Sequence, residues 1–165
     1  MMEAIHADRT RDLDSLRCIV ISSTGPVFSS GHDLKELYRV NFGLFCSTPG
    51  IALARAVPRK MAAYMLLTGR PISATEALRC GLVSHVVPES QLQDLTEQII
   101  KDIQNKSRAV VAQGKEFFYH QIQHPVESAY QDGTQAMVEN LGLKDCGAGL
   151  KAFFEKKAPE WSHKN

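Results

Sequence analysis

The balance between strand and helix signals most constrains what this chain can fold into. Residues 18–22 are predicted to form a strand, because they are apolar, mostly β-branched and followed by the turn residues 23–26. A weaker strand signal covers residues 82–87, and most of the remaining signals are helical. A lone strand cannot satisfy its own backbone N–H and C=O groups. The sequence therefore predicts an α/β domain with a helix-rich C-terminal half and an incomplete β-sheet.

Apolar periodicity and capping residues predict the helices, and a loop rich in Gly, Ser and Pro is expected over residues 41–50. The longer helices are predicted over residues 33–39, 51–67, 89–106, 107–122, 125–141 and 149–157. Pro58 should break or kink the second of these. Ser73 and Glu76 have capping-box spacing, which predicts a short helix that ends at Gly81.

Charge and cysteine usage exclude several classes of protein. The 165 residues suit one domain, and 19 Lys and Arg against 18 Asp and Glu lack the basic excess of a nucleic-acid-binding protein. No apolar run reaches the length of a membrane span. The four cysteines contain no C-x-x-C pair, so free thiols in a reducing compartment are expected. Residues 1–9 resemble neither a signal peptide nor a transit peptide.

Residues 25–37 contain the strongest candidate site. A glycine-containing turn follows the predicted strand and opens a helix, so backbone N–H groups there would favour an anion or a developing oxyanion. An ordinary strand-turn-helix with a serine cap is the alternative on this pattern alone. Ser30, His32 and Asp33 are near-neighbours on a turn, where side chains diverge, so a nucleophilic triad is not expected.

His120 and His124 have the i, i+4 spacing of metal ligands on a helix. No glutamate follows the first histidine as in the H-E-x-x-H motif, and Pro125 ends the helix. We therefore expect a solvent-exposed helix face here and no metal site.

Three motifs in the same order resemble the enoyl-CoA hydratase/isomerase (crotonase) family. They are FSSGHDLKE at 28–36, LTGRPISATEA at 67–77 with Gly-Leu-Val at 81–83, and the tail AFFEKKAPEW at 152–161. The resemblance covers residues 12–163. It implies a single truncated crotonase-like (ClpP/crotonase) domain over residues 1–165. That domain lacks the first strands and the central region that carries the second oxyanion loop, with the gap near residues 37–40.

The resemblance also implies a site for acyl-CoA thioesters, in which two backbone N–H groups hold the thioester oxygen. The first donor would be the N–H of His32, and Ser30, Gly31, Asp33 and Leu34 would line the acyl-CoA groove together with His32. The second donor and both acid–base glutamates of the family fall in the gap. The coenzyme A thioester is then substrate or ligand, and no other cofactor is expected.

The implied function is a protein of fatty acyl-CoA metabolism with little or no hydratase activity in this form, so its status as an enzyme stays open. One alternative is a non-enzymatic partner that joins oligomers of a full-length relative through its C-terminal helices. The resemblance also implies a trimer-type homo-oligomer formed through these helices. Another is an unstable, non-functional isoform. The family resemblance implies a mitochondrial location, with the cytosol as the alternative because no transit peptide is visible.

Overall fold

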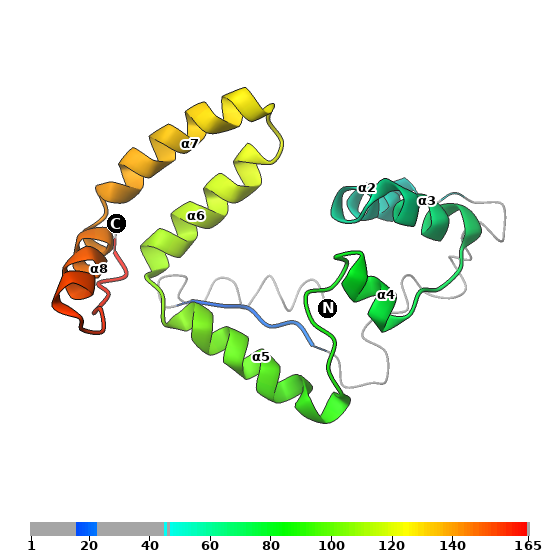
Figure 1. Cartoon of the computed structure of the whole chain (residues 1–165), viewed down its shortest axis with the longest axis horizontal. Helices are drawn as coiled ribbons and strands as arrows, with labels where there is room; N and C mark the ends of the chain where they lie inside the picture. Colours follow the sequence, from blue (N-terminus) through cyan, green and yellow to red (C-terminus); the bar gives the residue numbers. More distant parts are fainter. Residues whose placement is uncertain (1–15, 23–44, 46, 165) are drawn as a thin grey trace. The chain divides into compact units, whose positions relative to one another are not determined.

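The computed structural model describes residues 16–22, 45 and 47–164, and all regular secondary structure among them is helical (Figure 1). These residues fall into two compact units, 21–93 and 94–164 with 16–20. None of the described helices combines the length and the apolar character needed to cross a membrane. The helices are α2 (Ser47–Ala56), α3 (Arg59–Thr68), α4 (Ala74–Arg79), α5 (Glu89–Gln104), α6 (Arg108–Gln121), α7 (Val126–Leu141) and α8 (Lys144–Glu155).

The two strand predictions are wrong. Residues 18–22 and 82–87 form neither strand nor helix. A strand needs a neighbour for its backbone hydrogen bonds, and no residue in the described ranges is in a strand that could pair with either segment. The predicted helix over residues 33–39 lies outside the described residues.

In the unit of residues 21–93, α2 and α3 pack against each other. Pro58 separates them, as predicted, and its carbonyl accepts a hydrogen bond from Met61 N at 2.9 Å. The predicted loop is partly wrong, because α2 already begins at Ser47. Pro49 lies in the first turn, where its missing N–H is tolerated, and Gly50 is buried where a Cβ would lie 3.5 Å from the Leu66 side chain.

The capping box at the start of α4 is confirmed. Ser73 N donates to Glu76 Oε2 at 2.8 Å, and Glu76 N donates to Ser73 Oγ at 3.2 Å. The backbone hydrogen bond from Ser73 is the main cause that lowers the pKa of the Glu76 carboxyl. The helix is followed by Gly81 with φ of 77°, the left-handed conformation that a glycine adopts most easily.

In the other unit, α6 and α7 form an antiparallel helical hairpin, and α8 contacts both helices (Figure 1). The side-chain amide of Gln113 joins the two long helices. Its Nε2 donates to Ala136 O at 3.2 Å, and its Oε1 accepts from Asn140 Nδ2 at 3.1 Å. Helices α6 and α7 confirm the predictions over 107–122 and 125–141 to within one residue at each end.

Helix α8 begins at Lys144, five residues before the predicted start at Gly149. Of the two glycines in its interior, Gly147 and Gly149, the second is explained by packing. A Cβ at Gly149 would lie 3.1 Å from Cη2 of Trp161, so the absence of a side chain lets the indole ring approach the helix closely. The helix ends at Glu155, and the C-cap residue Lys156 has a left-handed φ of 54°.

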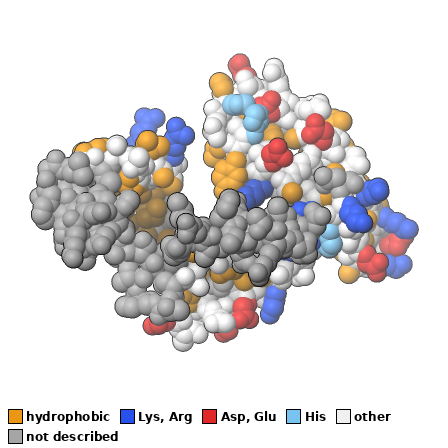
Figure 2. All heavy atoms as spheres, turned by 180° about the vertical axis from the view of Figure 1, so that it is seen from behind, with side chains coloured by type: hydrophobic (Ala, Val, Ile, Leu, Met, Phe, Trp, Pro, Cys, Tyr) orange, Lys and Arg blue, Asp and Glu red, His pale blue; other side chains and the backbone are white. Residues whose placement is uncertain are grey.

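Few apolar side chains are buried among the described residues, and many large ones are exposed, as Figure 2 shows at the surface. Phe153 and Phe154 are 77% and 79% exposed, and Tyr130 is 78% exposed. Exposed apolar surface on this scale is typical of a region that contacts another molecule.

Candidate functional site

The residues of the predicted oxyanion site, Ser30, Gly31, His32, Asp33 and Leu34, lie outside the described residues. Their roles therefore remain predictions from the family resemblance. The described residues contain three other features with polar or ligand-binding chemistry: a buried carboxylate, an apolar groove and a histidine cluster.

The buried carboxylate belongs to Asp145, in the first turn of α8, and is only 1% exposed. It accepts hydrogen bonds from Ser107 Oγ at 2.6 Å and from Ser162 Oγ and N at 2.6 and 2.7 Å. The backbone N of His163 donates to it at 3.0 Å. Asp145 thus connects the N-cap of α6, the start of α8 and the segment after α8.

These four donors hold the pKa of the Asp145 carboxyl well below its ordinary value of 3.8. The Ser107 hydroxyl makes the largest contribution, followed by the Ser162 hydroxyl, while burial acts in the opposite direction. Both carboxylate oxygens are occupied by donors within the protein. We therefore interpret Asp145 as a structural residue that stays ionised, rather than as a general base.

The segment after α8 is fixed by further contacts. Trp161 Nε1 donates to Asn105 O at 2.9 Å, and Nη1 of Arg17 lies 2.7 Å from Nδ1 of His163. Arg108 N also donates to His163 Nδ1 at 3.4 Å. Since guanidinium and amide nitrogens can only donate, His163 Nδ1 is the acceptor in both contacts.

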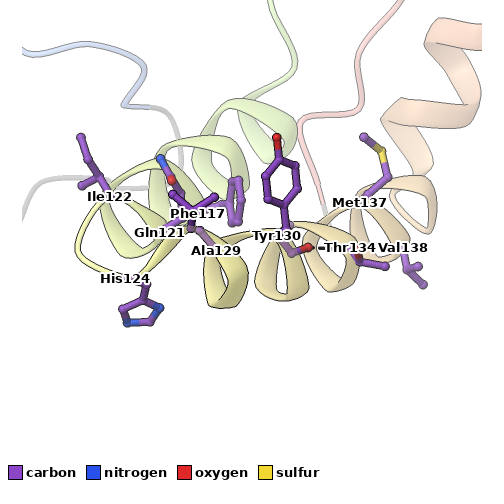
Figure 3. A pocket seen from close by; sticks show the side chains of 11 residues that line it. Phe117, Gln121, Ile122, His124, Ala129, Tyr130, Thr134, Met137 and Val138 are labelled. Atoms are coloured by element: carbon purple, nitrogen blue, oxygen red, sulfur yellow. Dashed lines mark hydrogen bonds between the residues drawn. The ribbon is translucent and has the colours of Figure 1, made fainter.

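An apolar groove of about 830 Å³ lies along the α6–α7 hairpin (Figure 3). Tyr130 rises from α7 on the groove side, and Phe117 of α6 lies beside it. Gly133 leaves room for the Phe117 ring, because a Cβ at residue 133 would lie 3.4 Å from Phe117 Cζ. The groove is lined by Phe117, Gln121, Ile122, His124, Val126, Ala129, Tyr130, Gly133, Thr134, Met137 and Val138. Such a surface can accept an apolar chain or an apolar helix face.

The histidine cluster lies at the end of the hairpin where α6 turns into α7. The His120 and His124 rings are 4.3 Å apart between centroids, in an edge-to-face arrangement. Asp132 Oδ2 lies 2.9 Å from His124 Nδ1 and 3.6 Å from His120 Nε2. The predicted exposed face is confirmed, since the His120 and His124 side chains are 57% and 37% exposed. The expectation of no metal site was made from the local pattern around the two histidines alone, and the sequence gave no signal for Asp132, which comes from the second turn of α7.

Comparison with known proteins identifies the family. The pattern described as Enoyl-CoA hydratase/isomerase matches residues 40–164. A human relative, enoyl-CoA hydratase domain-containing protein 3, mitochondrial, is 40% identical over 227 residues, which covers 99% of this chain and 75% of the relative. Because 227 exceeds the 165 residues of this chain, a stretch of the relative within the aligned span has no counterpart here.

Solved structures agree with this result. The crystal structure of human enoyl-CoA hydratase domain-containing protein 3 matches with a TM-score of 0.88 and 40% identity, over 97% of this chain and 88% of that chain. An enoyl-CoA hydratase from Mycobacterium smegmatis matches with a TM-score of 0.72 and 48% identity, over 74% of this chain and 48% of that chain. The predicted crotonase-like fold family is therefore confirmed, while the sheet is not seen in the described residues. The chain belongs to the enoyl-CoA hydratase/isomerase family.

Proposed function

We propose that this chain is a protein of fatty acyl-CoA metabolism that binds an acyl-CoA thioester and catalyses little or no hydration. The observation that carries the proposal is the combination of family membership with a shortened chain. The matched family pattern begins at Val40, and the human relative aligns over a span longer than this whole chain. The longer span supports a missing internal stretch, and the start of the matched pattern at Val40 supports its placement between Leu37 and Val40.

The gap removes chemistry that hydration requires. The backbone N–H of His32 would supply one donor to the thioester oxygen, and the second donor belongs to the missing loop. Loss of one oxyanion donor costs about 10²–10³ in rate. Hydration also needs an acid and a base beside the substrate, and both glutamates of the family fall in the gap. Glu76, which is described, caps α4 and is not available for this role.

Binding and turnover should be measured on the same full-length chain. Calorimetric titration with crotonyl-CoA measures binding, and loss of the enoyl absorbance of crotonyl-CoA measures hydration. The paired variants His32→Pro and His32→Ala isolate the backbone donor, because proline removes the N–H whereas alanine removes only the side chain. Circular dichroism of both variants checks that the helices are retained.

We expect binding without turnover, weakened by His32→Pro and little changed by His32→Ala. No heat at millimolar crotonyl-CoA, in a chain that unfolds cooperatively, would overturn the binding proposal. Hydration at the rate of a complete family member, measured in parallel, would overturn the proposal that catalysis is lost. Equal affinity in both His32 variants and the parent chain would remove the N–H of His32 from the binding site.

A second candidate function is that of an oligomerisation partner for a full-length relative. The apolar groove along α6 and α7 and the exposed Phe153 and Phe154 favour it, because such surface is typical of protein contacts. Co-expression with a full-length relative followed by size-exclusion chromatography tests the idea. Elution of the two chains as separate peaks would exclude it.

Two further proposals concern stability and location. A non-cooperative thermal transition without near-ultraviolet circular dichroism would favour the unstable isoform over both functions. The human relative is named a mitochondrial protein, which supports a mitochondrial location for this chain, with the cytosol as the alternative. Fluorescence microscopy of the chain with a C-terminal fluorescent fusion distinguishes the two compartments.

A further inference from the structure

We propose that His120, His124 and Asp132 form a binding site for a divalent first-row transition-metal ion, with Zn²⁺ as the probe. The three side chains come from the last turn of α6, the α6–α7 connection and α7. The site is independent of acyl-CoA binding, because it involves none of the residues assigned to the thioester.

The two separations from the Asp132 carboxylate fit tetrahedral coordination. One ligand atom from each residue, two imidazole nitrogens and a carboxylate oxygen, lies within 4.8 Å of the others. Ligand atoms at Zn–N and Zn–O distances near 2.1 Å in a tetrahedron are about 3.4 Å apart. The observed separations from Asp132 Oδ2, 2.9 Å to His124 Nδ1 and 3.6 Å to His120 Nε2, bracket this value. Small adjustments of the side chains would bring all three atoms onto one ion.

The ligand chemistry selects the class of ion. Two neutral imidazoles and one carboxylate suit Zn²⁺, Ni²⁺ and Cu²⁺ better than Ca²⁺ or Mg²⁺, which prefer oxygen ligands. Three protein ligands leave a fourth tetrahedral position for water.

The cluster is accessible to an ion from solution. The side chains of His120, His124 and Asp132 are 57%, 37% and 36% exposed. Figure 2 shows histidine and acidic side chains together at the surface. In Figure 3 the His124 ring points away from the Tyr130 ring, so an ion there would leave the Tyr130 side of the groove open.

An ion at this position would connect the two helices of the hairpin. Its ligands lie on both sides of the turn, so binding requires the α6–α7 arrangement and would stabilise it by mass action. Zn²⁺ should therefore raise the unfolding temperature of the chain in proportion to the logarithm of its free concentration. Mg²⁺ at the same concentration should leave that temperature unchanged.

Calorimetric titration of the reduced full chain with ZnCl₂ is the direct test. We expect one ion per chain at this site. Each of His120→Gln, His124→Gln and Asp132→Asn should weaken binding at least about tenfold, because each variant leaves a site with only two protein ligands. His85→Gln is the matched control, since His85 is exposed and outside the cluster. Its affinity for Zn²⁺ should equal that of the parent chain.

Two results would overturn the proposal. One is the absence of detectable binding at millimolar Zn²⁺. The other is binding that persists in the His120→Gln/His124→Gln double variant, which would place the ion elsewhere, for example on a cysteine thiol. The near-ultraviolet spectrum of the Co²⁺ complex checks the assignment, because the proposed site has no sulfur ligand and should show no thiolate charge-transfer band. Circular dichroism confirms that each variant keeps its helices.

Discussion

Ser107 donates a 2.6 Å hydrogen bond to the buried carboxylate of Asp145, and so joins the first residues of α6 and α8 across 38 positions of sequence. The same hydroxyl oxygen accepts from Val110 N at 3.3 Å and caps α6. The Ser107 side chain therefore provides hydrogen bonds both to the N-terminus of α6 and to the buried carboxylate.

Ser107→Ala should destabilise the chain. Loss of the cap alone costs about 1 kcal/mol, and loss of a donor to Asp145 adds to that cost. Urea unfolding followed by circular dichroism measures the change. Ser90→Ala, an exposed position in the first turn of α5, is the control and should change stability by less than about 0.5 kcal/mol. Equal stability of the two variants would contradict the structural role of Ser107.

Asp145 should make stability depend on pH below the neutral range. Its pKa in the folded chain is lowered from 3.8 by the hydroxyls of Ser107 and Ser162, so the unfolded chain binds a proton first as the pH falls. The contribution of Asp145 is fully present above its unfolded pKa and is lost as the pH falls through the folded one. Unfolding free energies measured between about pH 6 and pH 2 should fall more steeply in the parent chain than in Asp145→Asn. Parallel curves for the two proteins would assign the acid sensitivity to other carboxyl groups.

Gln113→Ala should loosen the α6–α7 hairpin. The substitution removes two hydrogen bonds and leaves Ala136 O and Asn140 Nδ2 without this partner, at a cost of about 1–3 kcal/mol. Hydrogen exchange of the α7 amides measures the local effect. Gln135→Ala, whose amide bonds only to Glu139 on the same helix, serves as the control and should leave that exchange nearly unchanged.

The two glycines inside α8 should respond to alanine in opposite ways. Nothing lies within 4 Å of a Cβ at Gly147, so Gly147→Ala should stabilise the helix by about 1 kcal/mol. At Gly149 the new Cβ would meet the Trp161 ring at 3.1 Å, which should cancel or exceed the same gain. Thermal unfolding compares the two variants, and Trp161 fluorescence reports displacement of the ring. Equal stabilisation by both substitutions would show that the ring moves without cost.

Local signals predicted much of the helical structure. The Ser73–Glu76 capping box, the break at Pro58 and the limits of α6 and α7 depend on residues close in sequence, so a single pattern specifies each one. The start of α8 was missed because its glycines suggest a helix end, whereas Gly149 is required by contact with Trp161. The strand predictions failed because a strand needs a partner strand for its backbone hydrogen bonds, and no local sequence pattern reveals whether that partner is present.

The described polar sites are formed by residues that are distant in sequence. Analysis of local sequence patterns therefore did not identify Asp145 or Asp132 as members of these sites. Asp145 appears as an ordinary first-turn acid until Ser162 and His163 reach it from the segment after α8. His120 and His124 are recognisable from their spacing, but Asp132 joins them only because α7 folds back along α6. The oxyanion residues around His32 were identified by motif and stay a prediction.

The Gln113 amide has an effect at a distance. Its hydrogen bonds to Ala136 and Asn140 hold α7 against α6, and in that alignment Asp132 faces the two imidazoles. A slip of α7 by a single turn would move Asp132 by about 5.4 Å. A residue that could never touch the ion would thereby determine how tightly it is held, so loss of metal affinity in Gln113 variants would report helix alignment rather than ligand chemistry.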